Sequence, residues 1–374
     1  MINLVDLTVI FVTKNRKNYL VRNLKRWSQT DAKIIVMDGS SESNSDLILS
    51  LLPNVKYFHN NNSVEQRLYF ASKIINTKYA MIASDDDLLI FEGVDSCIRE
   101  LENDPDLVSV VGKPLGFRLE QNVVKFFPIY PNFSKSGMAS SSNHWVRSYI
   151  HFKNYECTTI YSVLRSEIFK NICSIFKHTP TLSGNLMELI FEFSATFLGK
   201  NKVITQLYLL RSQECHANWH STEPYGHWVL SINNHVRRDL VSKLDKNILS
   251  SKSHVFGGIR RRIFLLTLLS QQLSDLSRRF RISEELRWVI FLPLFFFVNF
   301  SLSWRNKVVL LKNKIVSWQK KSFQNAALKE FLEKINLEKL TNNNDFASEE
   351  LIRNHPELKQ IKMLIENFHI GQRI

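Results

Sequence analysis

Three consecutive aspartates, Asp85 to Asp87, directly follow a short apolar run at positions 79–83, and apolar residues resume at Leu88. The apolar run predicts a buried strand. Adjacent carboxylates repel one another, and in a packed interior they would destabilise the fold unless a cation neutralised them. Mg²⁺ and Mn²⁺ prefer carboxylate oxygens and leave coordination positions for phosphate. The triplet therefore indicates a metal and phosphate site at a strand end, with a solvated acidic turn as the alternative.

Strands and helices alternate on either side of this triplet. We predict strands at 7–12, 33–37, 55–58, 79–83 and 107–112, and helices at 19–27, 45–52, 64–75 and 93–101. Further along we predict a hairpin at 117–127, strands at 156–163 and 203–210, and helices at 165–176 and 185–197. The alternation with short connections predicts an α/β fold, with a mostly parallel sheet and helices on both faces.

The pattern changes near residues 218–226, where basic helical periodicity replaces strand-like runs. We therefore predict three parts: a catalytic domain at 1–220, a basic and mainly α-helical domain at 221–340, and a helical tail at 341–374. The net charge is +14, and lysine and arginine greatly outnumber acidic residues between 252 and 329. This asymmetry favours an anionic partner, either a membrane surface or a phosphorylated substrate. Nucleic acid is disfavoured because no nucleic-acid-binding motif accompanies the charge.

The most apolar window of the chain lies at 288–304, bracketed by Trp288 and Trp304 and flanked by basic residues. It suits insertion at a membrane interface, while a buried helical hairpin broken at Pro293 and a short spanning helix are the alternatives. The first residues lack the pattern of a signal peptide. The four cysteines lack the spacing of a disulfide framework. We expect a cytoplasmic protein with reduced thiols, attached peripherally to the inner face of the cytoplasmic membrane.

Polar side chains follow three predicted strands: Thr13, Asn15 and Arg16 after the first, Asp38 after the second, and the triplet after the fourth. In a doubly wound sheet such strand ends meet at one edge, where ligands bind. Asp38 could accept hydrogen bonds from a nucleobase, Asp85 from a ribose, and Asp87 could hold a metal that bridges two phosphates. The chain has neither GxGxxG nor GxxxxGK[ST], which disfavours a dinucleotide oxidoreductase and a P-loop enzyme.

The order VTKNR, VMDGSS and YAMIASDDDLL resembles the nucleotide-sugar-binding half of the GT-A glycosyltransferases, family 2-like, of bacterial surface polysaccharide synthesis. The resemblance covers about residues 5–220. It implies a GT-A (Rossmann-like) sheet, a nucleoside diphosphate sugar donor and Mn²⁺ or Mg²⁺. Thr13, Asn15 and Arg16 would then line the nucleotide pocket. Asp38 would contact the base, Asp85 the ribose with Asp86 beside it, and Asp87 the metal.

Later residues supply the remaining roles that the resemblance implies. Inverting members place an acidic general base at the start of a helix, for which Glu188 is the best match and Glu192 the alternative. Arg211 suits a phosphate fork and His216 a metal ligand, with His220 as a weaker candidate. His144 and Trp145 could line an acceptor pocket.

The leading hypothesis is a metal-dependent inverting glycosyltransferase that moves a sugar from a nucleotide donor to a glycan or lipid-linked acceptor. A sugar nucleotidyltransferase on the same fold is one alternative, although residues 13–18 contain no glycine. A non-catalytic, membrane-associated adaptor is the other, and the intact triplet argues against it. The donor sugar, its base, the linkage and the oligomeric state stay open.

Overall fold

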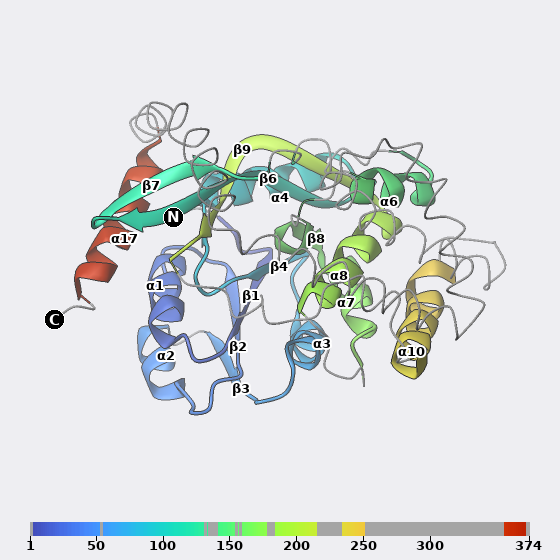
Figure 1. Cartoon of the computed structure of the whole chain (residues 1–374), viewed down its shortest axis with the longest axis horizontal. Coiled ribbons are helices and arrows are strands. Elements are labelled where there is room, and N and C mark those ends of the chain that lie inside the picture. The colour runs from blue at the N-terminus through green and yellow to red at the C-terminus, as the bar shows by residue number, and fades with distance from the viewer. Residues whose placement is uncertain are drawn as a thin grey trace, which may run out of the picture.

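A computed structural model of the chain describes residues 3–52, 55–130, 133, 141–153, 156, 159–177, 184–214, 234–250 and 355–371. Its centre is one mixed sheet with strand order β3-β2-β1-β4-β8-β6-β9-β5, and β7 pairs with β6 beside this path. Helices cover both faces of the sheet (Figure 1). The predicted α/β class is therefore confirmed.

The first half of the sheet is parallel, as the alternating sequence predicts. Its strands are β1 (Leu7–Thr13), β2 (Lys33–Asp38), β3 (Lys56–His59) and β4 (Tyr79–Ala83). The connecting helices are α1 (Lys17–Trp27), α2 (Ser45–Leu51) and α3 (Val64–Ile74). Successive β1 residues enter opposite cores, since Ile10 packs with α3 residues while Val9 and Phe11 pack with α1 residues. This two-sided burial explains why the strand is apolar at nearly every position.

The second half of the sheet mixes directions. Its strands are β5 (Leu88–Leu89), β6 (Leu107–Glu120), β7 (Val123–Pro128), β8 (Val163–Arg165) and β9 (Lys200–Ser212). β6 runs parallel to β9, whereas β8 is antiparallel to both β4 and β6, and β5 is antiparallel to β9. The parallel pattern therefore holds for β1 to β4 but not for the whole sheet. Whether two adjacent strands run parallel or antiparallel depends on which distant segments pair, and the local sequence does not encode this.

Of two further β elements predicted from the sequence, the hairpin is present and the strand at 156–163 is largely replaced by a turn. The hairpin is confirmed as β6–β7, and its turn residues Gln121 and Asn122 have φ angles of 50° and 68°. These left-handed angles are those of the two-residue turn that matches strand twist. The strand predicted at 156–163 is instead a 3₁₀ turn, η1 (Thr159–Tyr161), followed by the short β8.

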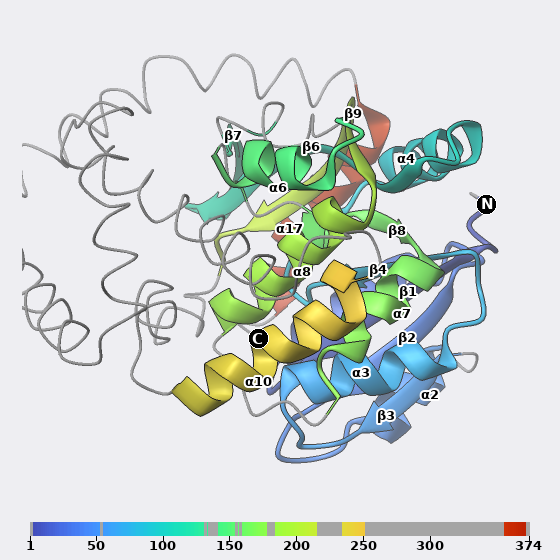
Figure 2. The same ribbon diagram turned by 90° about the vertical axis from the view of Figure 1, so that its right-hand side faces the viewer.

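Among the described residues, the helices that follow α3 and precede the last one are α4 (Phe91–Asn103), α6 (His144–Lys153), α7 (Ser166–Ser174), α8 (Gly184–Leu198) and α10 (Asn234–Leu244). A π-helical turn, η3 (Asp245–Leu249), continues α10. Leu240, Leu244 and Ile248 are fully buried in the same cluster as residues of α7 and α8. Figure 2 shows α10 on the same side of the molecule as α7 and α8. The division into 1–220, 221–340 and 341–374 stays a prediction, although α10 shares the core of the first part.

The final helix, α17 (Pro356–Gly371), packs against the β6–β7 hairpin (Figure 1). Its buried Leu358, Ile361 and Ile365 form an apolar cluster with Leu88 of β5 and Leu210 of β9. Within the residues that the structure describes, none of the helices combines the length and apolar character needed to cross a bilayer. The window at 288–304, with its alternatives, lies outside those residues.

Candidate functional site

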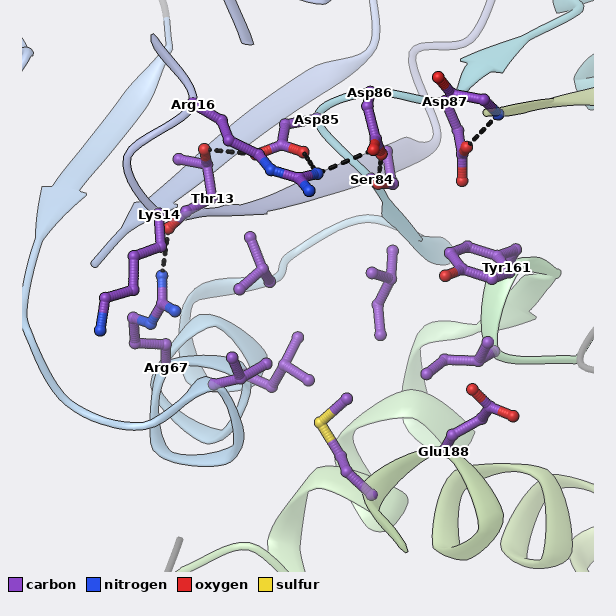
Figure 3. Close-up of a pocket in the computed structure, with 18 of the residues that line it drawn as sticks. Thr13, Lys14, Arg16, Arg67, Ser84, Asp85, Asp86, Asp87, Tyr161 and Glu188 are labelled. Atoms are coloured by element: carbon purple, nitrogen blue, oxygen red, sulfur yellow. Dashed lines mark hydrogen bonds and ion pairs between the residues drawn. The ribbon is translucent and has the colours of Figure 1, made fainter. Parts of the chain in front are cut away.

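A cavity of about 390 Å³ opens at the carboxyl ends of β1 and β4. It is lined by seven of the predicted site residues: Thr13, Arg16, Asp85, Asp86, Asp87, Glu188 and Arg211. In Figure 3 the aspartates lie along one side and Glu188 lies across the cavity from them. The convergence expected from the sequence is therefore present for the ends of the first and fourth strands.

The acidic triplet is not a solvated turn. The exposed fraction is 4% for Asp85 and 5% for Asp87, and both side chains border the cavity. Burial, followed by the charge of Asp86, raises the pKa of Asp85 to about 6. Burial likewise raises the pKa of Asp87 to about 6, although Arg211 opposes that shift. These buried carboxylates would be stabilised by further positive charge from a ligand or ion.

Residues at the end of the first strand donate hydrogen bonds to the first two aspartates. The Thr13 hydroxyl donates to Asp85 over 2.7 Å. Arg16 Nη1 donates to Asp85 over 3.2 Å and to Asp86 over 2.8 Å. The loop after β1 and the loop after β4 are therefore joined by charge-assisted hydrogen bonds at the floor of the cavity.

The third aspartate is bound by the end of β9. Arg211 Nη1 and the backbone amide of Ser212 each donate to Asp87 over 2.8 Å. The Arg211 guanidinium also lies 4.8 Å from the ring centre of Tyr161, which borders the same cavity. β5 pairs with β9 in the register Leu88 to Leu210, and this pairing brings the two ends together.

The backbone of the acidic loop is held by polar side chains of α1. Asn23 donates to the carbonyls of Asp85 and Asp87 over 2.7 and 2.9 Å. Arg22 donates to the Asp86 carbonyl over 2.8 Å, and Arg26 donates to the carbonyl of Leu89. Sequence reasoning did not identify these residues. The one feature of the sequence that points to them is that Arg22, Asn23 and Arg26 lie beside the apolar stripe of the predicted helix.

The two glutamates considered as general base have different surroundings. Glu188 of α8 borders the cavity, and its side chain is labelled opposite the aspartates in Figure 3. Glu192, one turn later, is fully buried and lies 2.8 Å from His151 Nε2. It also accepts a 2.8 Å hydrogen bond from the amide of Ile160. Only Glu188 is therefore in a position to meet a ligand in this cavity.

Two predicted nucleotide contacts do not line the cavity. Asp38 is fully buried and accepts hydrogen bonds from Tyr57 over 2.7 Å and Asn44 over 3.0 Å. Burial raises its pKa, but the hydrogen bonds from Ser40, Asn44 and Tyr57 outweigh that effect and lower it. Asn15, with φ of 56°, binds Ser40 and Ser41 and so ties the loop after β1 to the loop after β2. Their contacts with a base or nucleotide stay predictions.

Other cavity residues were not predicted from the sequence. They include Lys14, Arg67 and Tyr161. Arg67 Nη1 donates to the carbonyls of Thr13 and Met37 over 2.7 and 2.6 Å, which fixes the two strand ends together. A Cβ on Gly39 would lie 2.7 Å from the Arg67 guanidinium carbon, so glycine leaves room for this arginine. The sequence signal was the Asp38-Gly39 turn, which does not reveal the partner.

The residues predicted to line an acceptor pocket or to complete a metal site do not join the cavity in the described part of the chain. Trp145 packs against Phe197, with ring centres 4.8 Å apart, and His144 packs against the same ring at 4.5 Å. Neither borders the cavity. His216 and His220 lie outside the described residues. Cys97 and Cys173 are free and buried, while Cys157 and Cys215 are outside the described residues.

The carboxylates present fit a hard divalent cation. In the part of the chain that the structure describes, no group of three or more His, Cys, Asp or Glu side chains is arranged to hold a metal by itself. Mg²⁺, however, is commonly bound by one or two carboxylates together with substrate phosphates. Asp87 and its neighbours supply such oxygens at the border of the cavity, and their burial favours added positive charge.

No protein-family model matches the chain, and no curated protein matches it. Among solved structures, S. aureus TarS 1–349 is similar over 74% of this chain and 92% of that chain, with 12% identity and a TM-score of 0.43. The complex of the same fragment with UDP-GlcNAc is similar over 74% of this chain and 93% of that chain, with 11% identity and a TM-score of 0.44. Likeness at this level carries no inference about the chemistry of the present chain.

Proposed function

We propose that the protein is a metal-dependent, inverting glycosyltransferase that uses a nucleoside diphosphate sugar. The observation that carries the proposal is the convergence on one cavity of an aspartate cluster, three arginines and a separate glutamate. The family resemblance of the three strand-end segments supports the same reading. A cavity of about 390 Å³ is also of the size that small-molecule sites have.

The cationic side of the cavity suits the donor diphosphate. Arg16, Arg211 and Lys14 border it, and the two arginines already contact the aspartates. Guanidinium groups bind phosphate oxygens in a fork and keep their charge at any relevant pH. On this reading both arginines would turn toward the diphosphate when the donor binds and would stabilise the negative charge that develops on it.

Glu188 suits the proton transfer from the acceptor. The acceptor oxygen would form a bond to the anomeric carbon while its proton moves to the Glu188 carboxylate. The bond from the anomeric carbon to the phosphate oxygen would break, and the nucleoside diphosphate would leave with the electron pair. Attack on the face opposite the leaving group inverts the anomeric centre, and a general base of this kind contributes about 10²- to 10⁴-fold.

Asp87 is the residue that we propose to hold Mn²⁺ or Mg²⁺, with Asp85 and Asp86 beside it. When bound, such an ion supplies electrostatic stabilisation of the departing diphosphate. The residues of the chain fix the oxygen donors on a loop whose carbonyls are bound by α1. The role of His216 as a further ligand rests on the resemblance alone.

A glycan or lipid-linked acceptor in bacterial surface polysaccharide synthesis completes the proposal. The basic segment between 252 and 329 supports a location against anionic lipid at the inner membrane face.

A thermal-shift screen of nucleotide sugars and nucleoside diphosphates, with and without Mn²⁺, tests the proposal. A ligand that binds only the folded state raises the unfolding temperature, so we expect a metal-dependent rise for one base family. The stabilising donor is then incubated with the protein and Mn²⁺. Release of nucleoside diphosphate supports a transferase. Formation of nucleoside triphosphate and sugar 1-phosphate only when pyrophosphate is added indicates a nucleotidyltransferase, and neither binding nor turnover of any donor would refute enzymatic function.

A further inference from the structure

The last described helix of the chain, α17, contacts residues that hold the acidic loop in place. His369 of α17 contacts Glu214, which lies just after β9. Glu214 is bound by both terminal nitrogens of Arg22 over 2.9 Å, and Arg22 in turn donates to the Asp86 carbonyl over 2.8 Å. Phe368 adds a ring 4.7 Å from the Arg22 guanidinium. A continuous chain of contacts therefore runs from α17 to the middle aspartate of the site.

A second chain of contacts begins at the other end of the same helix. Glu357 pairs with Arg26 and accepts a 2.9 Å hydrogen bond from the amide of Phe91. Arg26 donates to the carbonyl of Leu89, which is the residue that ends β5. Each end of α17 thus binds one of the α1 arginines that hold the backbone of residues 85–89.

Between these ends, α17 packs against apolar residues of β5 and of the neighbouring strands. Leu358, Ile361 and Ile365 are at most 1% exposed and pack in one cluster with Leu88 and Ile90. Leu88 follows Asp87 directly in the chain. The strand that follows the acidic loop therefore shares its apolar packing with α17.

The charged contacts do more than attach the helix. The exposed fraction of the side chain is 7% for Arg26 and 14% for Glu357, so both charges have lost most of their hydration. A buried ion pair adds little stability over an apolar contact of the same size, and its best-attested use is to select one register. The apolar face of α17 could pack in several registers, whereas Glu357 and His369 select the one that meets Arg26 and Glu214.

We propose that α17 is a positioning element of the catalytic site, with His369 and Glu357 as positioning residues that hold the acidic loop through Arg22 and Arg26. This inference rests on the proposed function only for its catalytic consequence. The loop is expected to keep the geometry in which Asp87 meets Arg211 only while both ends of α17 are docked. Neither positioning residue borders the cavity.

The test measures hydrogen exchange of the amides of residues 84–90 in the full chain, without donor. His369→Leu removes the polar contact, His369→Gln retains a donor, and Met363→Ala changes a half-exposed position of the same helix. We expect about tenfold faster loop exchange in His369→Leu and in Glu357→Ala. Wild-type exchange is expected in Met363→Ala, with a return toward it in His369→Gln. Circular dichroism and the unfolding temperature establish that each variant is folded.

Turnover provides a second measurement, which should stay unchanged if His369 only stabilises the packing of α17. With the donor that emerges from the thermal-shift screen, kcat should fall about tenfold in His369→Leu while KM changes by less than about twofold, and His369→Gln should recover most of kcat. Unchanged loop exchange in both His369→Leu and Glu357→Ala would overturn the inference, as would faster exchange confined to α17. Should His369→Leu fail to fold, Glu357→Gln provides the milder test. A loosened loop in a protein that turns over no donor would instead refute the proposed function and leave the inference standing.

Discussion

Arg211 Nη1 lies 2.8 Å from Asp87 Oδ2, although 124 positions separate the two residues in the chain. The antiparallel pairing of β5 with β9 places them together at one border of the cavity. A cation that binds Asp87 and an anion that binds Arg211 would therefore occupy adjacent positions. This adjacency suits a diphosphate with its metal.

Asp87→Asn should reduce transfer at least about 100-fold, because the amide cannot supply the negative oxygen that a hard cation prefers. The fold should persist, since the buried charge is unfavourable by itself and its pKa is raised to about 6. Product release from the stabilising donor measures activity, and circular dichroism checks the fold. A variant with full activity would remove the metal role from Asp87.

The stability of the metal-free protein should fall as pH rises. Asp85 and Asp87 each have a pKa of about 6 in the folded state, above the ordinary value of 3.8. The folded state therefore binds these protons more tightly than the unfolded state. Their contribution is fully present below pH 3.8 and is lost as pH rises through about 6, with an order of magnitude of about 3 kcal/mol for each group.

Chemical denaturation between pH 4 and pH 7.5 measures this dependence. The double variant Asp85→Asn/Asp87→Asn is the control and should show a flatter profile in the same window. Mn²⁺ should restore stability at the upper end of the window in the wild type alone. A wild-type profile that matches that of the double variant would show that these carboxyls are not shifted.

Glu188→Gln should lower kcat by about 10²- to 10⁴-fold and leave donor affinity close to the wild-type value. The amide has nearly the shape of the carboxylate but cannot accept the acceptor proton. Steady-state kinetics with varied donor separate the two effects. An equal loss of donor affinity, with kcat retained, would assign Glu188 to donor binding instead of proton transfer.

Glu192→Ala should destabilise the protein by about 3–5 kcal/mol, because it leaves His151 and the Ile160 amide without their buried partner. Glu188→Ala is the matched control one turn earlier on the same helix. It should lower the free energy of unfolding much less, since Glu188 is only partly buried. Urea denaturation of the two variants measures the difference. Equal stability of both would contradict the structural role of Glu192.

Much of the inner fold and the floor of the site could be predicted from the sequence, because these features follow from local patterns. Apolar runs separated by helical periodicity specify β1 to β4 and their helices. The polar residues Thr13, Arg16 and Asp85 end up together because parallel strands place their carboxyl ends at one edge.

Only the tertiary structure decided the remainder. It bound Asp38 to Tyr57 and Asn44, separated Glu188 from the buried Glu192, and connected α17 to the acidic loop through Glu357 and His369. These outcomes depend on strand register and on which faces of distant helices meet. The sequence by itself specified the local elements and the acidic strand end, whereas long-range packing selected the partner of each carboxylate, because no local pattern encodes a contact between residues so far apart in the chain.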